Sequence, residues 1–219
     1  MKTTQEIAAI IAALKELYPD AACSLDYGKD YELLFSVRLA AQCTDARVNL
    51  VTPALFQRYP TLEAFADADV DEVGRCVQSC GFWRAKARDI VAAAQQLLAR
   101  FGGKVPDNME DLLTLPGVGR KTANLILGDI YGQEGYVCDT HCIRITGRLG
   151  ITDGSKDPLK VEQQLRKVIP PEESNNFCHR LVLHGRAVCT ARTAKCGECP
   201  LTAWCRYAKT EFKKAAKQS

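Results

Sequence analysis

The chain has 219 residues, 47% of them hydrophobic and 25% charged, which is long enough for one large domain or two small lobes. No stretch is long and apolar enough to cross a bilayer, and Met1-Lys2-Thr3-Thr4 does not begin a secretory signal, so we expect a soluble, intracellular protein. The net charge of +3 excludes little by itself, but residues 1–110 carry 12 basic and 15 acidic groups, whereas residues 111–219 carry 17 and 11. The basic excess of residues 111–219 would suit a polyanionic partner, although a solvated protein surface often carries a charge excess of this size.

The first half of the chain predicts a succession of helices, each opened by a capping residue and continued by apolar residues at helical spacing. The expected helix starts are Thr3-Thr4-Gln5-Glu6 (typical of a capping box), Asp30, Thr44 or Asp45, Asp69, Arg84, and a second capping box at Asp107-Asn108-Met109-Glu110. Pro53 must kink or split the third helix, because proline lacks the N–H that a helix interior needs. Gly102-Gly103 closes the long amphipathic helix that begins near Arg84.

The second half continues the helical pattern. Asp157-Pro158 starts one helix, since proline suits the first helical position, and another runs from Ser174 to Val188. Alternating apolar runs of the strand type are nearly absent, so we predict an all-α fold. The Lys-rich end after Lys209 is expected to be a frayed tail.

One segment combines a tight turn with two cations, Leu115-Pro116-Gly117-Val118-Gly119-Arg120-Lys121. The glycines allow a reversal, and the N–H groups at the start of the following helix form an anion site that suits a phosphate. Arg120 and Lys121 stand where the helix dipole disfavours cations, which is tolerable if an anion docks and which favours a neutral, nucleophilic lysine. The alternative is an ordinary helix–helix turn with a solvated basic pair.

The eleven cysteines are an odd number spread over apolar segments, which is not typical of a secreted disulfide framework. We expect seven of them to act mainly as small buried hydrophobic residues. These seven are Cys23, Cys43, Cys76, Cys80, Cys138, Cys142 and Cys178.

The other four, Cys189, Cys196, Cys199 and Cys205, are separated by six, two and five residues and predict a metal centre. The wide outer spacing favours a [4Fe–4S] cluster, and zinc is the alternative. Arg192 and Lys195 in the first loop would be displayed to a phosphate backbone.

Asp139 comes directly before a predicted helix, so an ordinary N-cap role would explain it. The functional alternative is a carboxylate near Lys121 that takes or relays protons and stabilises cationic character on a sugar. A neutral amine that attacks an electrophilic sugar carbon beside a carboxylate is a coherent covalent mechanism.

Together these segments resemble the endonuclease III family of helix-hairpin-helix DNA glycosylases, which carry an iron–sulfur cluster. The resemblance covers nearly the whole chain and rests on Leu115 to Asn124, Val137-Cys138-Asp139-Thr140-His141, Leu183-His184-Gly185-Arg186, Ala41-Gln42-Cys43-Thr44-Asp45 and the cysteine spacing. It implies a six-helix lobe with the helix-hairpin-helix over residues 22–132, and a lobe of residues 1–21 and 133–219 that holds [4Fe–4S]. It also implies a cytoplasmic monomer, without membrane attachment, that serves the bacterial nucleoid.

The resemblance further implies base excision repair on double-stranded DNA that contains damaged pyrimidines or abasic sites. A damaged base would be flipped out, and Lys121 would attack the sugar, expel the base, form a Schiff base and nick the strand by β-elimination. Asp139 would be the essential carboxylate. The implied DNA contacts are Gln42, which fills the gap left by the base, His141, and the hairpin residues Gly117, Gly119 and Arg120. The cluster would be structural, for DNA docking.

The chain departs from the family pattern at Phe82, which follows Gly81 where an aliphatic wedge is common, although a ring could still intercalate. Cys138 also replaces a more typical aliphatic neighbour of Asp139. The relative that removes adenine from mismatches lacks the lysine, so Lys121 argues against it. Two other classes stay open: a non-catalytic DNA-binding module, and an electron carrier built on the four cysteines.

Overall fold

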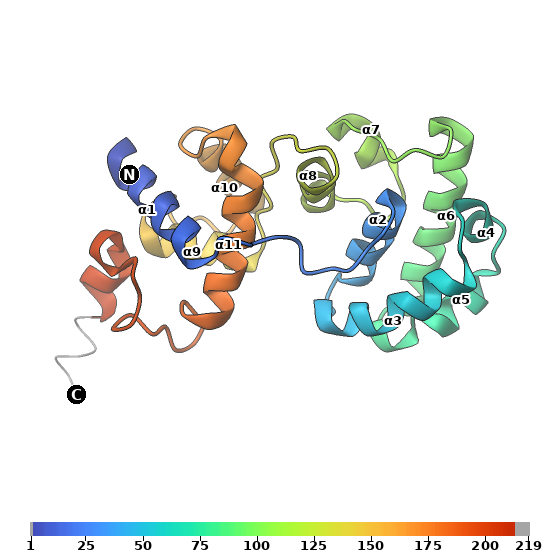
Figure 1. Ribbon diagram of the computed structural model, residues 1–219, viewed down its shortest axis with the longest axis horizontal. Coiled ribbons are helices and arrows are strands. Elements are labelled where there is room, and N and C mark those ends of the chain that lie inside the picture. The colour runs from blue at the N-terminus through green and yellow to red at the C-terminus, as the bar shows by residue number, and fades with distance from the viewer. Residues whose placement is uncertain (1, 213–219) are drawn as a thin grey trace. The chain divides into compact units, whose positions relative to one another are not determined.

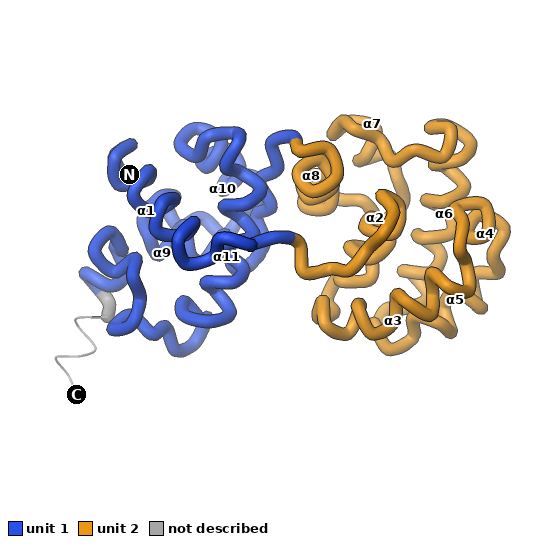
Figure 2. Tube along the Cα trace, in the orientation of Figure 1, with its two compact units in different colours: residues 1–22, 133–219 blue, residues 23–132 orange. Residues whose placement is uncertain are grey.

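The computed structural model describes residues 2–212, which form helices joined by turns and loops (Figure 1). No strand occurs in this described part, so the all-α prediction is confirmed. The chain divides into two compact units, one made of Met1–Ala22 with Gln133–Ser219 and the other of Cys23–Gly132 (Figure 2). The predicted lobe boundary at residue 22 lies one residue from this division. None of the described helices is both long and apolar enough to span a membrane.

The Cys23–Gly132 unit is built around one long helix. Its elements are α2 (Asp30–Leu39), α3 (Asp45–Arg58), α4 (Leu62–Ala66), α5 (Val70–Cys76), the 3₁₀ turn η1 (Gln78–Cys80), α6 (Trp83–Phe101), α7 (Met109–Thr114) and α8 (Arg120–Asp129). Helix α6 packs against α4, α5 and α2, and α8 packs against α7 and α2. Phe65 lies at the centre of an aromatic cluster in this core, with its ring 5.0 Å from that of Phe35.

The other unit joins the two ends of the chain. It contains α1 (Thr4–Leu17), α9 (Thr140–Leu149), α10 (Pro158–Leu165), η2 (Pro171–Glu173), α11 (Ser174–Ala187), η3 (Thr202–Trp204) and a π-helical turn, η4 (Ala208–Phe212). Helix α11 packs against both α9 and α1, so helix α1 is part of the same core as segments more than 150 residues further along the chain. Ile10 and Leu14 of α1 are fully buried in that core.

Several predicted helix ends are confirmed. Thr3 and Glu6 form a reciprocal capping box, Thr44 and Asp157 are N-caps, and Gly102 ends α6 in the left-handed conformation with φ +58°. These signals could be found because cap and helix are adjacent in sequence.

Other ends differ from the predictions. Asp30 is the first residue of α2 and Lys29 is its cap, because Glu32 accepts the N–H groups of Gly28 and Lys29 from inside the helix. Helix α6 begins at Trp83, one residue early, because Phe82 takes a left-handed conformation that turns the chain into the helix. The cap of α7 is Asn108, one residue after the predicted Asp107, and its side chain accepts the N–H of Asp111. Asp111 in turn accepts from the Asn108 side chain and not from its backbone, so the predicted capping box does not form.

The structure corrects two further predictions and describes only part of the segment that a third one concerns. Pro53 lies inside an unbroken α3, so it does not split the helix, and the alternative that it kinks the helix stays a prediction. Of the seven cysteines expected in the core, four are buried, but Cys23, Cys43 and Cys76 are only half-buried: Cys23 and Cys43 lie in loops between helices, and Cys76 is the last residue of α5. The expected frayed tail begins one residue into η4, and its residues 213–219 lie outside the described part of the chain.

Candidate functional site

The hairpin between α7 and α8 is a tight turn of four residues. The N–H of Val118 donates to the carbonyl of Leu115 at 3.2 Å, Pro116 is the second residue of the turn, and Gly117 is the third with φ +73°. Proline followed by a positive-φ glycine is the signature of a type II turn. This local chemistry explains why the chain reverses here and delivers its next residues to the start of α8.

The start of α8 lacks the negative charge that would stabilise a helix. Gly119 is the N-cap and offers no side-chain oxygen, and the first turn has no acidic residue. The first N–H groups of a helix have no intrahelical acceptor, and they carry partial positive charge. Lys121 is exposed at the second helical position. The arrangement is suited to an anion, with a primary amine beside it.

Asp139 is the N-cap of α9, in the other unit. Its Oδ1 accepts the N–H of Cys142 at 2.7 Å, and the carboxylate is half-buried at the positive end of the helix. The predicted cap role is therefore real. The cap bond uses one of the two carboxylate oxygens, so a cap role does not exclude a chemical one.

The residues that flank Asp139 form a layer of buried thiols. Cys138 precedes Asp139, and Cys142 lies one turn into α9. Hydrogen bonds with Cys138 and Cys178, together with burial, hold the pKa of the Cys142 thiol well above its usual range. The Cys142 thiol therefore stays protonated, and the buried thiols serve as apolar packing beside Asp139.

His141 lies against α11 at a glycine. A Cβ on Gly185 would lie 2.3 Å from the His141 Nδ1, so only glycine leaves room for the ring. Arg144 Nη2 donates to the same Nδ1 at 3.1 Å and to the Gly185 carbonyl at 3.3 Å. An arginine can only donate, so His141 Nδ1 is the acceptor and its proton is carried on Nε2. The contact gives a physical reason for the glycine in Leu183-His184-Gly185-Arg186.

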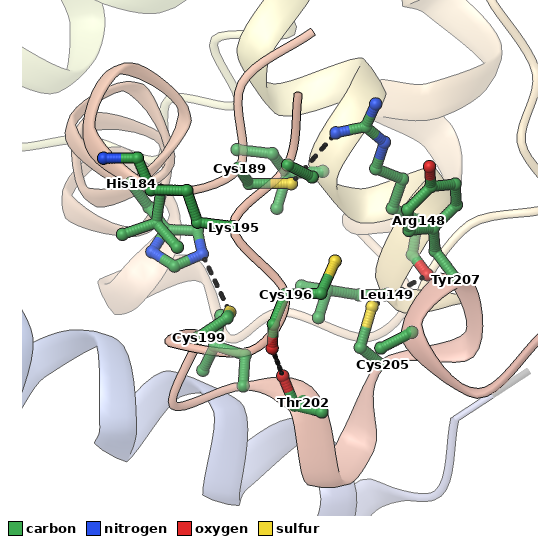
Figure 3. Close-up of a pocket in the computed structure, with 15 residues that line it drawn as sticks. Arg148, Leu149, His184, Cys189, Lys195, Cys196, Cys199, Thr202, Cys205 and Tyr207 are labelled. Atoms are coloured by element: carbon green, nitrogen blue, oxygen red, sulfur yellow. Dashed lines mark hydrogen bonds between the residues drawn. The ribbon is translucent and has the colours of Figure 1, made fainter. Parts of the chain in front are cut away.

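The four predicted metal ligands line one pocket (Figure 3). Cys189 follows α11, and Cys196, Cys199 and Cys205 come from the loop and turns that follow it. The remaining wall is largely apolar, with Ile145, Leu149, Val188, Ala194, Leu201 and Ala208, and no acidic residue lines it. Among the described residues, no three His, Cys, Asp or Glu side chains are gathered tightly enough to hold a single metal ion. An all-sulfur donor set around a wider space fits an iron–sulfur cluster.

Two side chains that the sequence analysis did not single out contact these sulfurs. Arg148 donates to Cys189 Sγ at 3.3 Å and to the carbonyls of Thr190 and Ala191, which fixes the first loop (Figure 3). His184 Nε2 lies 3.5 Å from Cys199 Sγ, and its Nδ1 lies 3.2 Å from the Tyr18 hydroxyl. Such contacts to metal-binding thiolates orient them and tune the metal.

The protonation of His184 follows from its burial, which lowers its pKa to about 4. The neutral ring has one N–H and one acceptor nitrogen, and its two nitrogens face the Cys199 sulfur and the Tyr18 hydroxyl. A thiolate at Cys199 would accept from Nε2, which would leave Nδ1 to accept the Tyr18 hydroxyl. Position 184 could have been found from the Leu183-His184-Gly185-Arg186 segment, whereas the contact with Tyr18 spans 166 residues and leaves no local signal.

Gln42 and Phe82 are exposed and share an unusual backbone. They are the only non-glycine residues with positive φ in the described part of the chain, at 56° and 46°. Such conformations cost free energy and gather at functional loops. Phe82 is 70% exposed, which is rare for a large apolar ring.

A buried lysine ties the two loops together. Lys86 Nζ donates to the carbonyls of Leu39 and Cys80, each at 2.8 Å, so it joins the chain before Gln42 to the chain before Phe82. Burial lowers the pKa of Lys86. The sequence analysis missed Lys86, because a lysine on an amphipathic helix is usually a surface residue.

The predicted site residues thus fall into two groups. Gln42, Phe82, Gly117, Gly119, Arg120 and Lys121 belong to the Cys23–Gly132 unit, and Asp139, His141, Arg192, Lys195 and the four cysteines belong to the other. Arg192 and Lys195 are exposed on the loop that Arg148 fixes, as expected of residues displayed to a partner.

Residues 35–171 match the model of the HhH-GPD superfamily of base excision DNA repair proteins, so the chain belongs to that class. The chain is 48% identical to endonuclease III of Synechocystis over 202 residues, which cover 92% of each protein. It is 36% identical to endonuclease III of Escherichia coli over 90% of this chain and 93% of that one. A solved structure of a trapped endonuclease III–DNA covalent intermediate matches 97% of this chain and 100% of that one, with a TM-score of 0.91 and 38% identity.

The chain is therefore a member of the endonuclease III family, as its motifs indicated. It is a base excision repair enzyme, a DNA N-glycosylase with AP lyase activity, which confirms the predicted reaction class. The two rival classes, a non-catalytic DNA-binding module and an electron carrier, are not what this family does.

Proposed function

We propose that the chain removes oxidised pyrimidines from double-stranded DNA and nicks the strand, with Lys121 as the nucleophile. The observation that carries this proposal is the position of Lys121, exposed directly after the hairpin in the first turn of α8, whose own residues include no acid. An anion at this helix start would bring a phosphodiester, and the sugar attached to it, to the amine. The similarity to a trapped covalent complex of endonuclease III with DNA supports this role.

The proposed reaction proceeds through an imine. The neutral amine of Lys121 attacks the sugar C1′, and the damaged base leaves with the electrons of the glycosidic bond. Ring opening gives the imine, loss of a C2′ proton expels the 3′ phosphate by β-elimination, and water then releases the lysine. Asp139 is the proposed carboxylate that takes or relays these protons and stabilises positive charge on the sugar.

Access to the base requires that the nucleotide leave the stack, at a cost of about a few kcal/mol that is smaller for a damaged base. We assign Gln42 to the gap left by the base and Phe82 to the neighbouring base step, where an exposed ring can insert. The hairpin residues Gly117, Gly119 and Arg120, together with His141, Arg192 and Lys195, are proposed contacts to the backbone.

We assign a [4Fe–4S] cluster to Cys189, Cys196, Cys199 and Cys205. The all-sulfur donor set around one pocket supports this choice over zinc. When bound, the cluster would be structural: it would hold the loop that carries Arg192 and Lys195. Purified protein should be brown and contain about four irons per chain. Zinc in place of iron would contradict the assignment.

We further propose that one chain acts alone, as a monomer, on the DNA of the bacterial nucleoid in the cytoplasm. A single chain contains the hairpin, the carboxylate and the cysteine pocket, so no partner residue is needed to complete the set. Sedimentation at catalytic concentration should give the mass of one chain, and a dimer would contradict the proposal.

The chemical step is tested by borohydride trapping on duplexes that contain an abasic site or thymine glycol. The wild type should give a covalent protein–DNA adduct on both, and Lys121→Ala should give none while still binding the duplex. Lys104→Ala is the matched control, because Lys104 is an exposed lysine of the same unit outside the hairpin. An adduct that survives in Lys121→Ala would contradict the proposal.

A further inference from the structure

An ion pair joins α2 to α6 beside the hairpin. Both Nε and Nη2 of Arg38 lie 2.7 Å from Oδ2 of Asp89, across 51 residues of sequence. The two side chains are only 23% and 24% exposed. Their attraction is therefore screened less than that of a fully exposed pair, and substitution of one side chain leaves the other charge half-buried without its partner.

The pair lies directly against the turn. A Cβ on Gly117 would lie 2.7 Å from Cδ and Nε of Arg38 and 2.9 Å from Oδ2 of Asp89, closer than a real Cβ approaches other heavy atoms. Gly117 is thus required twice, once for its positive φ and once because the ion pair occupies the space that a side chain would need. The backbone of the turn rests on the Arg38 side chain.

Loss of the Arg38 charge and loss of the Asp89 charge would affect the hairpin turn differently. A carboxylate this close to a phosphate-binding turn repels a phosphodiester unless a cation neutralises it. Without Arg38, the turn would lose the side chain on which it rests and would also face the bare charge of Asp89. Without the Asp89 charge, the turn would keep both the contact and the cation.

We propose that Arg38, held in place by Asp89, is a positioning residue for the DNA-binding hairpin. It sets the conformation of the turn at Leu115 to Val118 and neutralises the carboxylate nearest to it. This proposal rests on the proposed function of the hairpin as the phosphate-binding element. Arg38 does not touch the reacting atoms; it acts through the turn that presents Lys121.

The test compares Arg38→Met, Arg38→Lys, Asp89→Asn and the double variant Arg38→Met/Asp89→Leu. Affinity is measured by fluorescence anisotropy on a duplex with an uncleavable tetrahydrofuran abasic analogue. We expect Arg38→Met to raise Kd about ten-fold and Asp89→Asn to raise it by no more than about three-fold. The lysine variant should recover part of the loss because it keeps the charge, and the double variant should recover part because it removes the bare carboxylate.

Two further readouts separate positioning from general stability. The single-turnover rate at saturating DNA should change by less than about two-fold in Arg38→Met, because only binding is affected. Amide hydrogen exchange in a peptide that spans residues 112–122 should accelerate, since the Val118 bond to Leu115 is less well held. Arg58→Met is the matched control: it breaks the exposed Arg58–Glu72 pair of the same unit and should leave Kd unchanged.

Equal losses of affinity in Arg38→Met and Asp89→Asn, in proportion to losses of melting temperature, would overturn the proposal in favour of a merely structural pair. An unchanged Kd in a folded Arg38→Met would overturn it as well. If Arg38→Met does not fold, the double variant replaces it, because it leaves neither charge without its partner. A Kd of the double variant equal to that of the wild type would then overturn the proposal. Failure of the proposed function would appear differently, as absence of a trapped adduct or of DNA binding by the wild type.

Discussion

At the scale of single residues, Lys121 and Asp139 form an instructive contrast, because each stands at a helix start. Asp139 caps α9 through its Oδ1, and the helix dipole favours its charge. Lys121 stands in the first turn of α8, where the dipole disfavours its charge and which contains no acidic residue of its own. Helix stability alone accounts for Asp139 but not for Lys121, so a chemical role is most needed for the lysine.

Tyr136 carries a prediction for stability and its pH dependence. Its buried hydroxyl donates to the Ile169 carbonyl at 2.9 Å, and burial raises its pKa to about 12. Tyr136→Phe should lower the free energy of unfolding by about 1–2 kcal/mol at neutral pH, because that carbonyl loses its partner. The folded state keeps the phenol proton more tightly than the unfolded state does, so the stabilisation is complete below about pH 10 and is lost as the pH rises through about 12.

Urea titrations at about pH 8 and about pH 11 test this expectation. The difference in free energy of unfolding between the wild type and Tyr136→Phe should be smaller at about pH 11 than at about pH 8. A difference that stays constant, or that grows, would contradict the assignment of a raised phenol pKa.

At the scale of elements, the start of α8 trades stability against anion binding. Gly119 has extended backbone, φ −102° and ψ 175°, and a Cβ there would meet no atom within 4 Å, so an aspartate fits. Gly119→Asp supplies the missing cap and a favourable charge, and should stabilise the unit by about 0.3–1 kcal/mol. The same charge should weaken binding to abasic-analogue DNA by about ten-fold or more, because it competes with the phosphate.

Gly119→Asn is the control for this pair of effects, since it caps without charge. For each variant, the melting temperature gives the change in stability and fluorescence anisotropy gives the change in DNA affinity, both measured on one preparation. A variant in which stability and DNA affinity rise together would show that the start of α8 is not a phosphate site.

Elements were predictable from sequence where the controlling residues are neighbours. Thr3, Thr44 and Asp157 cap the helices that they precede, and Pro116 with Gly117 dictates the hairpin turn. The start of α2 was misplaced by one residue because Glu32 caps it from within the helix. Left-handed Phe82 was not foreseeable, since no local rule gives a bulky residue that conformation.

At the scale of the whole molecule, contacts between distant segments were not predictable from one sequence. Lys86 bonds to a carbonyl 47 residues away, and Arg38 pairs with Asp89 across 51. Each looks like a surface residue on an amphipathic helix, and the packing of α2 against α6 gives each of them a partner distant in sequence. The candidate site was predicted from its motifs, whereas the side chains that support it were found only in the structure.

The joining of the two chain ends yields a further prediction. Helix α1 packs on α11, which leads into Cys189, and Tyr18 after α1 contacts His184 behind Cys199. Leu14→Ala, at a fully buried position, should cost about 2–5 kcal/mol of unfolding free energy. It should also hasten the loss of iron to a chelator, because local opening of this core exposes the cysteine pocket.

Leu17→Ala in the same helix is the matched control, because Leu17 is 38% exposed. Leu17→Ala should lower the free energy of unfolding by no more than about 0.5 kcal/mol, and it should release iron at the rate of the wild type. Equal effects of the two substitutions would contradict the role of α1 as part of this core.

The most direct measurement for the enzyme as a whole is the chemical identity of the residue that bonds to DNA. The wild type is incubated with an abasic-site duplex and borohydride, digested with a protease, and the DNA-linked peptide is sequenced by mass spectrometry. We predict that the reduced sugar is attached to Nζ of Lys121, in the peptide that follows the hairpin turn. Attachment to any other lysine or to the amino terminus, with Lys121 unmodified, would contradict the central claim.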